Sequence, residues 1–190
     1  MRTTLKAVSI DPKEWKAKAE TLLQRVKKQR DSNNKRHDHI HFETKQSYEL
    51  SLLAERRFAV LAGEAFRIAG EQCWYDSAKA YALAASLSAD QSSKALLYSE
   101  TGMIAEKMDI NFSTEYYRSA VSAHCDALEF KLAALLIVRM AKNYAKHDNL
   151  SASLEEFEKA SRFFSAAGMV NEAEQALEKA AHMLGKTGKF

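Results

Sequence analysis

Apolar residues recur every three or four positions from Ser47 almost to the end of the chain, which is the spacing of amphipathic helices. Short polar or glycine-containing breaks interrupt this pattern at residues 70–74, 88–92, 109–111, 125–126, 147–149 and 168–169. No stretch alternates apolar and polar residues in the way that a half-buried strand does. Together with one helix at the N-terminal end, the pattern predicts an all-α protein of about eight helices.

The N-terminal helix is predicted from its start signals. Pro12 suits the first turn of a helix, and Asp11 suits the position that caps it. We expect this helix to end near Asp31, because residues 32–41 (SNNKRHDHIH) carry no apolar stripe and are rich in turn residues. The chain therefore divides into a basic helix and flexible loop over residues 1–45 and a helical-repeat domain over residues 46–190.

Three of the predicted helices share a short motif. In each, a serine stands four residues before an aromatic residue, and a small residue follows three positions later. The motif occurs as Ser77–Tyr81–Ala84, Ser113–Tyr117–Ala120 and Ser153–Phe157–Ala160. The aromatic residues are separated by similar intervals (117 − 81 = 36 and 157 − 117 = 40). Small residues let paired helices approach closely while the aromatic ring fills the gap, so the motif favours a solenoid of antiparallel helical hairpins.

Composition narrows the class of protein. With 46% hydrophobic and 28% charged residues, one proline and six glycines, the chain differs from collagens, disordered tails and disulfide-stapled miniproteins. Cys73 and Cys125 form no CxxC pair and are expected to be thiols of a reducing compartment, which favours a cytoplasmic protein. No secretory signal is recognised, and the longest apolar run, residues 132–138, is far shorter than the roughly twenty residues that cross a bilayer.

Charge is distributed unevenly along the chain. Residues 1–45 contain 12 Lys and Arg against 6 Asp and Glu, whereas the chain as a whole has a net charge of only +3. This asymmetry suggests an acidic partner for the head, such as phospholipid, nucleic acid or an acidic protein surface. A solvated basic helix explains the same pattern, so both interpretations stay open.

Two longer segments bring a family into view. The first, AERRFAVLAGEAFRIAGEQCWYDSAKAYALAASL (residues 54–87), combines small residues, an aromatic residue and Trp74 at a hairpin turn. The second, VRMAKNYAKHDNLSASLEEFEKASRFF (residues 138–164), ends in the aromatic pair Phe163–Phe164. Both resemble tetratricopeptide-like (TPR-like) solenoids and, more closely, the N-terminal solenoid part of the soluble NSF attachment proteins (SNAPs). The resemblance is collinear over most of residues 12–184.

The resemblance implies a fold and a function. It implies a right-handed α-solenoid that acts as a non-enzymatic, monomeric adaptor, binding SNARE or other coiled-coil helical bundles in vesicle trafficking and touching membranes through its first loop. SNAPs also stimulate the NSF ATPase through C-terminal helices. Because the sequence stops at Phe190, before the position of those helices, we expect the NSF-activating part to be missing from it, either because it is a piece of a longer protein or because it is a half-length relative.

Two other functions stay open. The first is a general TPR-like peptide-binding scaffold that has no connection with membrane traffic. The second is a lipid-binding or nucleic-acid-binding protein that uses the basic head alone. Specific nucleic-acid recognition is not expected, because the rest of the chain is acidic in sum and carries no recognisable reading helix.

The resemblance also implies where partners would bind. In the loop that SNAPs insert into membranes, Ile40 and Phe42 are the apolar candidates and Lys35 and Arg36 the basic ones, which predicts weak, peripheral insertion. Leu135 and Glu174 occupy positions where the family can carry partner-facing lysines. If the first helix of each pair lines the concave face, the basic candidates there are Arg56, Arg57, Lys94, Lys131, Arg139 and Lys142.

No catalytic constellation is found. His37, His39 and His41 alternate along one side of an extended chain, but a segment expected to be mobile makes a poor metal site, so we interpret them as a polar or pH-responsive loop. The tail motif GKTGK lacks the first glycine of a phosphate-binding loop and follows a helix rather than a strand. We therefore expect no metal, no cofactor and no enzymatic activity.

Overall fold

A computed structural model of the protein describes residues 11–37 and 45–187. These residues form eight α-helices and one short 3₁₀ helix, and no strand occurs among them. The elements are α1 (Pro12–His37), α2 (Lys45–Ala69), η2 (Glu71–Cys73), α3 (Trp74–Ser86), α4 (Gln91–Ala105), α5 (Ile110–Asp126), α6 (Phe130–Lys146), α7 (Leu150–Ala166) and α8 (Val170–Thr187).

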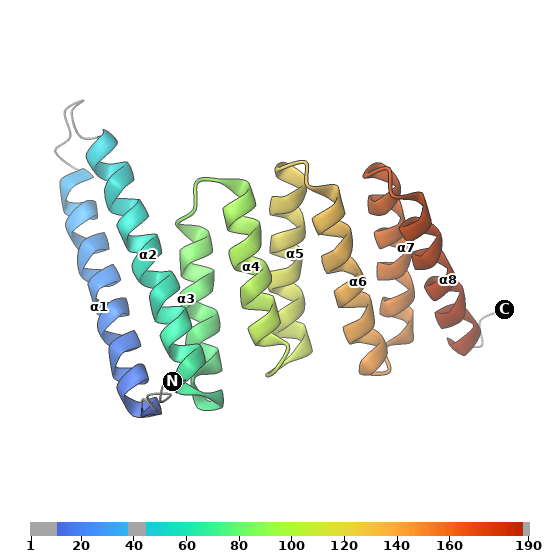
Figure 1. The fold of residues 1–190 in the computed structure, drawn as a ribbon, viewed down its shortest axis with the longest axis horizontal. Coiled ribbons are helices and arrows are strands. Elements are labelled where there is room, and N and C mark those ends of the chain that lie inside the picture. Colours follow the sequence, from blue (N-terminus) through green and yellow to red (C-terminus); the bar gives the residue numbers. More distant parts are fainter. Residues whose placement is uncertain (1–10, 38–44, 188–190) are drawn as a thin grey trace, which may run out of the picture.

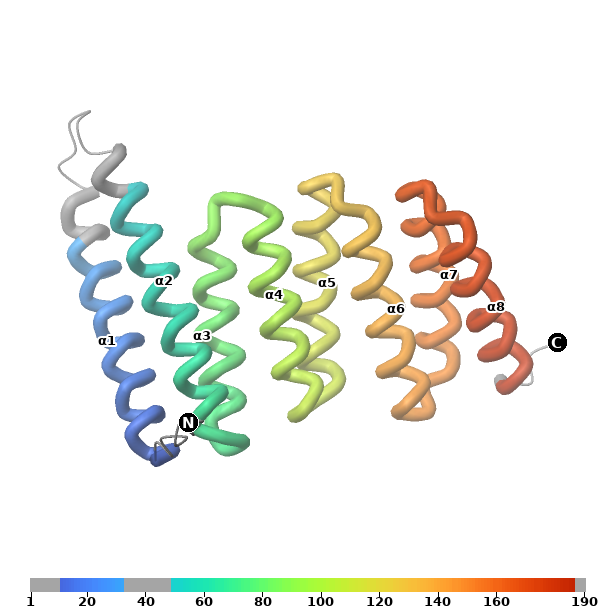
Figure 2. Tube along the Cα trace, viewed as in Figure 1, coloured from blue at the N-terminus to red at the C-terminus, as the bar shows by residue number. Residues whose placement is uncertain are grey.

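The helices are arranged as a solenoid. They follow one another in chain order along the long axis of the molecule, and their directions alternate (Figures 1 and 2). Each helix packs mainly against the helix before it and the helix after it. The predicted all-α solenoid of about eight helices is thereby confirmed.

Small residues at a constant interval set the distance between helices. Gly63, Gly102, Ala141 and Ala180 are separated by 39 residues each time (102 − 63, 141 − 102 and 180 − 141). A Cβ atom added to Gly63 would lie 2.7 Å from the Tyr81 ring, and one added to Gly102 would lie 2.6 Å from the Tyr117 ring. In the next repeat Ala141 packs in one cluster with Phe157 and Ala180.

The serine of the predicted motif also has a structural role. Ser77, Ser113 and Ser153 are all fully buried, and the Oγ of Ser77 donates a hydrogen bond to the carbonyl oxygen of Gly63 at 2.7 Å. This bond fixes α3 against the backbone of α2 at the point where the two helices approach most closely. The aromatic and small residues of the three copies are buried as well, as expected for a repeated helix contact.

Two predicted helix ends are wrong. The helix α1 continues past Asp31 to His37, so residues 32–37 are helical and not part of a loop, whereas residues 38–44 lie outside the described part. The amide of Gln29 donates to Ser51 Oγ at 2.8 Å, and such packing against α2 supports a polar segment that has weak helix propensity of its own. Helix α5 includes Cys125 and Asp126, and the break falls at residues 127–129.

The end of α5 has an unusual residue. The N–H of Leu128 bonds to the carbonyl of Cys125 and the N–H of Glu129 to that of His124, which is the Schellman pattern. Leu128 has φ 59°, in the left-handed region where glycine is usual, and its side chain is 75% exposed. Asp148 and Gly168 take the equivalent place after α6 and α7, with φ 58° and 73°.

Candidate binding surface

The even-numbered helices form one continuous face. Val60 of α2 packs in the same apolar clusters as Leu97 of α4, and Ala141 of α6 shares a cluster with Ala180 of α8. Polar bonds described below connect the two ends of α4 with α6 and the turn before it. We call the exposed side chains of α2, α4, α6 and α8 the even-helix face.

This face carries most of the exposed apolar surface. Among the described residues, 13 large apolar side chains are exposed, and 10 of them belong to the four even-numbered helices. The odd-numbered helices contribute only Tyr75 to this set, and the turns contribute Met108 and Leu128. Scattered exposed apolar residues are ordinary on a protein surface, but their concentration on one set of helices indicates a surface for a partner.

One row of the face can be followed directly in the sequence. Arg57, Leu96, Leu135 and Glu174 recur at the interval of 39 residues (96 − 57, 135 − 96 and 174 − 135), so they occupy the same position on successive even-numbered helices. All four are exposed, with Leu96 at 56% and Leu135 at 49%. The row therefore has two leucines at its centre and one charge of each sign at its ends.

Basic side chains lie around these leucines. Arg57, Lys131 and Lys142 are exposed, whereas Arg56 and Lys94 are half-buried. Neither Lys131 nor Lys142 takes part in a salt bridge with another described residue. These cations are therefore available to a partner that carries negative charge.

Arg139, the sixth predicted contact residue, is engaged inside the protein. Its guanidinium donates two hydrogen bonds of 2.7 Å to the two carboxylate oxygens of Glu106 at the end of α4, and it lies over the Tyr117 ring, 5.8 Å from its centroid. Tyr117 and Asn143 donate further bonds to Glu106 Oε1, at 2.7 Å and 2.6 Å. Arg139 thus connects α6 to α4, and a partner can reach only the remaining part of its side chain, which is 42% exposed.

These contacts change the charge equilibria of the network. Burial acts to raise the pKa of Glu106, but the hydrogen bonds from Arg139, Tyr117 and Asn143 outweigh it and hold the pKa of the carboxyl below its ordinary value of 4.5. The bond to Glu106 raises the pKa of Arg139. Burial and the bond to Glu106 also raise the pKa of Tyr117, so Glu106 and Arg139 are both charged at neutral pH.

A second polar contact joins α4 to the turn before α6. Glu129 accepts a hydrogen bond of 2.8 Å from Ser92 Oγ at the start of α4. Its other oxygen lies 2.7 Å from Nδ1 of His124, which is 2% exposed. The bonds from His124 and Ser92 lower the pKa of the Glu129 carboxyl. With no nucleophile at the imidazole, the arrangement supports the turn rather than catalysis.

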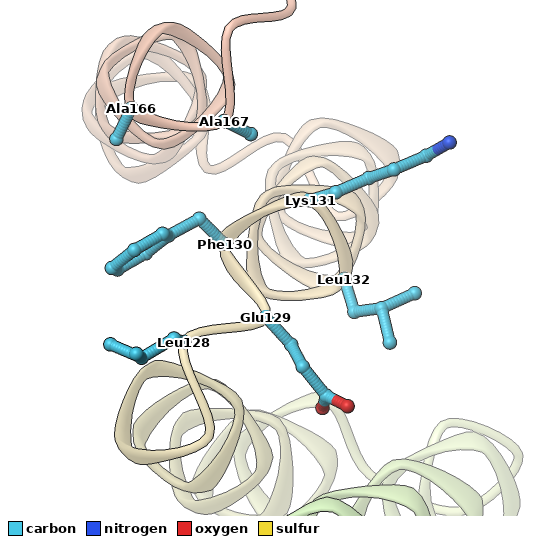
Figure 3. Close-up of a pocket in the computed structure, with 7 residues that line it drawn as sticks. All are labelled: Leu128, Glu129, Phe130, Lys131, Leu132, Ala166 and Ala167. Atoms are coloured by element: carbon cyan, nitrogen blue, oxygen red, sulfur yellow. The ribbon is translucent and has the colours of Figure 1, made fainter.

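A shallow cavity of about 440 Å³ lies beside this turn. Leu128, Phe130, Lys131 and Leu132 line it on one side of the gap, and the end of α7 lines it on the other with Ala166 and Ala167 (Figure 3). In this view Phe130 and Leu128 point to one side of α6, and Lys131 and Leu132 point to the opposite side. The start of α6 therefore contributes a lysine and a leucine to the even-helix face.

The predicted membrane-contact residues are only partly described. Lys35 and Arg36 belong to the last turn of α1, and Ile40 and Phe42 lie outside the described residues, as do His39 and His41. Among the helices of residues 11–37 and 45–187, none is both long and apolar enough to cross a membrane. The same residues contain no group of three or more His, Cys, Asp or Glu side chains placed to hold a metal ion.

Sequence reasoning found the charges of the face but missed its apolar centre and the Glu106 network. The constant interval of Gly63, Gly102, Ala141 and Ala180 is the signal that could have revealed the centre, because it aligns the even-numbered helices without any gap. No comparable signal exists for Glu106, since a carboxylate on a helix end is usually solvated.

Comparisons with known proteins agree with this architecture. The search of curated proteins gave no match. Among solved structures, one described as BtubC (BKLC) from P. vanneervenii is similar with a TM-score of 0.46 and 13% sequence identity, over 96% of this chain and 94% of that chain. The model of the family described as soluble NSF attachment protein, SNAP, matches residues 17–190, nearly the whole sequence. The chain therefore belongs to the SNAP family.

Proposed function

We propose that this protein is an adaptor that binds a SNARE-type or other coiled-coil helical bundle through its even-helix face. The observation that carries the proposal is the family match over residues 17–190, since SNAPs are non-enzymatic adaptors. Support comes from Arg57, Lys131 and Lys142, which are exposed on that face. Coiled-coil bundles present charged residues at the outer positions of their heptads, to which such cations are complementary.

The test is a titration of the full chain with an assembled SNARE bundle. Lys131→Glu combined with Lys142→Glu reverses two charges on α6 and should weaken binding by about tenfold or more, since each reversal replaces an attraction by a repulsion. Arg139 is left unchanged, because its loss would disturb the bond to Glu106. The matched control combines Arg118→Glu and Arg162→Glu, which reverse two exposed charges on α5 and α7 and should have little effect. The absence of saturable binding, or equal losses in both double variants, would contradict the proposal.

The proposal has a second, separable part at the membrane. We expect Lys35, Arg36, Ile40 and Phe42 to give weak peripheral contact with an anionic bilayer, because the two apolar side chains offer little area to bury. Flotation with vesicles that contain phosphatidylserine measures this contact. Replacing Ile40 and Phe42 by serine should abolish co-flotation, and retention of full binding by that variant would contradict this part alone.

The general TPR-like scaffold is the alternative that the same titration distinguishes. A peptide tail held in one groove depends on a few residues, whereas a bundle lying along the solenoid depends on charges distributed over several helices. Loss of binding on reversal of only one of the two lysines would therefore favour the peptide scaffold.

A further inference from the structure

The centre of the even-helix face is apolar, although its surroundings are basic. Leu96 and Leu135 occupy one position on successive even-numbered helices and are 56% and 49% exposed. Leu132, one turn from Leu135 on α6, is 38% exposed. These three leucines gain from a partner only if it covers them with apolar surface.

A closed helical bundle offers little such surface. In a four-helix bundle the apolar side chains of the heptads point inward, and the outer positions are polar or charged. Half-exposed leucines pressed against that exterior would desolvate charged groups without an apolar contact in return. The composition of the face is thus better suited to a helix whose apolar stripe is still uncovered.

The spacing of the face fits such a helix. Packed helices lie about 8–10 Å apart, and one heptad of a helix rises about 10.5 Å. Leucines one heptad apart on a partner helix can therefore contact Leu96 and Leu135 at the same time. The helix would cross α4 and α6 with its apolar stripe on the row of leucines.

Charge determines what borders the stripe of that partner. Lys94, Lys131 and Lys142 surround the leucines, with Lys131 and Lys142 exposed and unpaired among the described residues. Glu100 is the exposed acidic residue one turn from Leu96 on α4. Three lysines against one glutamate favour carboxylates on both sides of the partner's apolar stripe.

We propose that the even-helix face binds a single amphipathic helix whose leucine stripe is bordered by acidic residues, in the manner of a coiled-coil segment that has not yet joined its bundle. The inference rests on the proposed function as a helix-binding adaptor and names the state of the partner. The leucines supply the apolar contact, and the lysines select the acidic border.

The test uses fluorescence anisotropy with a labelled synthetic peptide of about three heptads, with leucine at the core positions and glutamate at the flanking positions, below the concentration at which it self-associates. The full chain should bind this peptide, and should bind a version with lysine at the flanking positions at least about tenfold more weakly. The variant that combines Leu96→Asp and Leu135→Asp should lose about tenfold or more in affinity. Thermal unfolding followed by circular dichroism checks that the variants remain folded.

Leu128→Asp is the matched control. It also exchanges an exposed leucine for aspartate, but in the turn between α5 and α6, where the equivalent left-handed position after α6 is occupied by Asp148. We expect its affinity for the peptide to stay within about twofold of that of the original chain. No peptide binding, or equal losses in the control and in the Leu96 and Leu135 variant, would overturn the inference.

An assembled SNARE bundle, titrated in parallel, separates this inference from the proposed function. If the bundle binds, depends on Lys131 and Lys142, and is indifferent to Leu96→Asp and Leu135→Asp, while the peptide does not bind, the inference fails and the proposed function stands. If the peptide binds through the leucines and the bundle does not bind at all, the face recognises single helices and the assignment to bundles fails.

Discussion

At the scale of single residues, the tightest constraint is the contact between Gly63 and the ring of Tyr81. In an ordinary helix, replacing glycine by alanine stabilises by about 0.5–1 kcal/mol. Here the new Cβ would lie 2.7 Å from the ring, so the ring or the helix must move, and overpacking of this kind costs about 1–3 kcal/mol. We expect Gly63→Ala to lower the free energy of unfolding by about 1–2 kcal/mol, as measured by urea denaturation.

A double-mutant cycle checks the cause of that loss. In a chain that already carries Tyr81→Leu, the clash is removed, and Gly63→Ala should become neutral or stabilising. An unchanged penalty in that background would mean that the ring is not the obstacle. The pairing of Ala141 with Phe157 in the third repeat shows that the fold accommodates a methyl group when its neighbours are arranged for it.

Leu128 presents the opposite situation, a side chain where glycine would fit better. A non-glycine residue in the left-handed conformation costs about 1 kcal/mol or slightly more, and a side chain that is 75% exposed recovers little by burial. We expect Leu128→Gly to raise the free energy of unfolding by about 0.5–1 kcal/mol in urea denaturation. Leu128→Ala keeps the strained backbone and should leave the stability nearly unchanged, and a loss of stability in the glycine variant would show that Leu128 makes a contact worth more than its strain.

At the scale of elements, α4 and α6 are connected by a carboxylate with three donors. Glu106 has a pKa below 4.5 in the folded protein, so it stabilises the fold at pH values above its ordinary pKa and loses that contribution as the pH falls through the lowered value. We expect Glu106→Gln to cost about 1–2 kcal/mol at pH 7, where the bidentate pair is lost.

The pH dependence separates this pair from a general effect of charge. The stability difference between the original chain and Glu106→Gln should shrink as the pH falls below 4.5, because protonation disables Glu106 in the original chain too. Urea denaturation between pH 3 and pH 7 measures it, with Glu158→Gln on the exposed side of α7 as the control. A difference that is constant over this range would contradict the role given to the carboxylate.

The elements also show what a sequence can and cannot predict. The starts of α4, α5 and α7 were predictable because Asp90, Asp109 and Asn149 cap them with side-chain hydrogen bonds, and such residues are recognisable in a sequence. The end of α5 was missed because Leu128 takes the place of the usual glycine. The pairing of Arg139 with Glu106 could not be predicted, since an arginine on a helix is in most cases solvated and its partner is remote in the sequence.

At the scale of the whole molecule, each helix packs mainly against its neighbours in the chain, so a local loss of stability should stay local. We expect Gly63→Ala to accelerate amide hydrogen exchange by about tenfold in α2 and α3, and to leave the exchange of α7 and α8 within about twofold. Mass spectrometry of peptic fragments measures both regions in one experiment. Equal acceleration in all helices would show that the solenoid unfolds as one cooperative unit.

The unbroken interval from Gly63 to Ala180 also makes the molecule a modular ruler. A duplicate of residues 103–141 inserted after Ala141 would begin and end at the same helical position, so every new interface would join surfaces that already meet in the protein. The array could be lengthened by whole repeats in this way, and each added repeat would extend the even-helix face by one more helix without changing the helices that flank it.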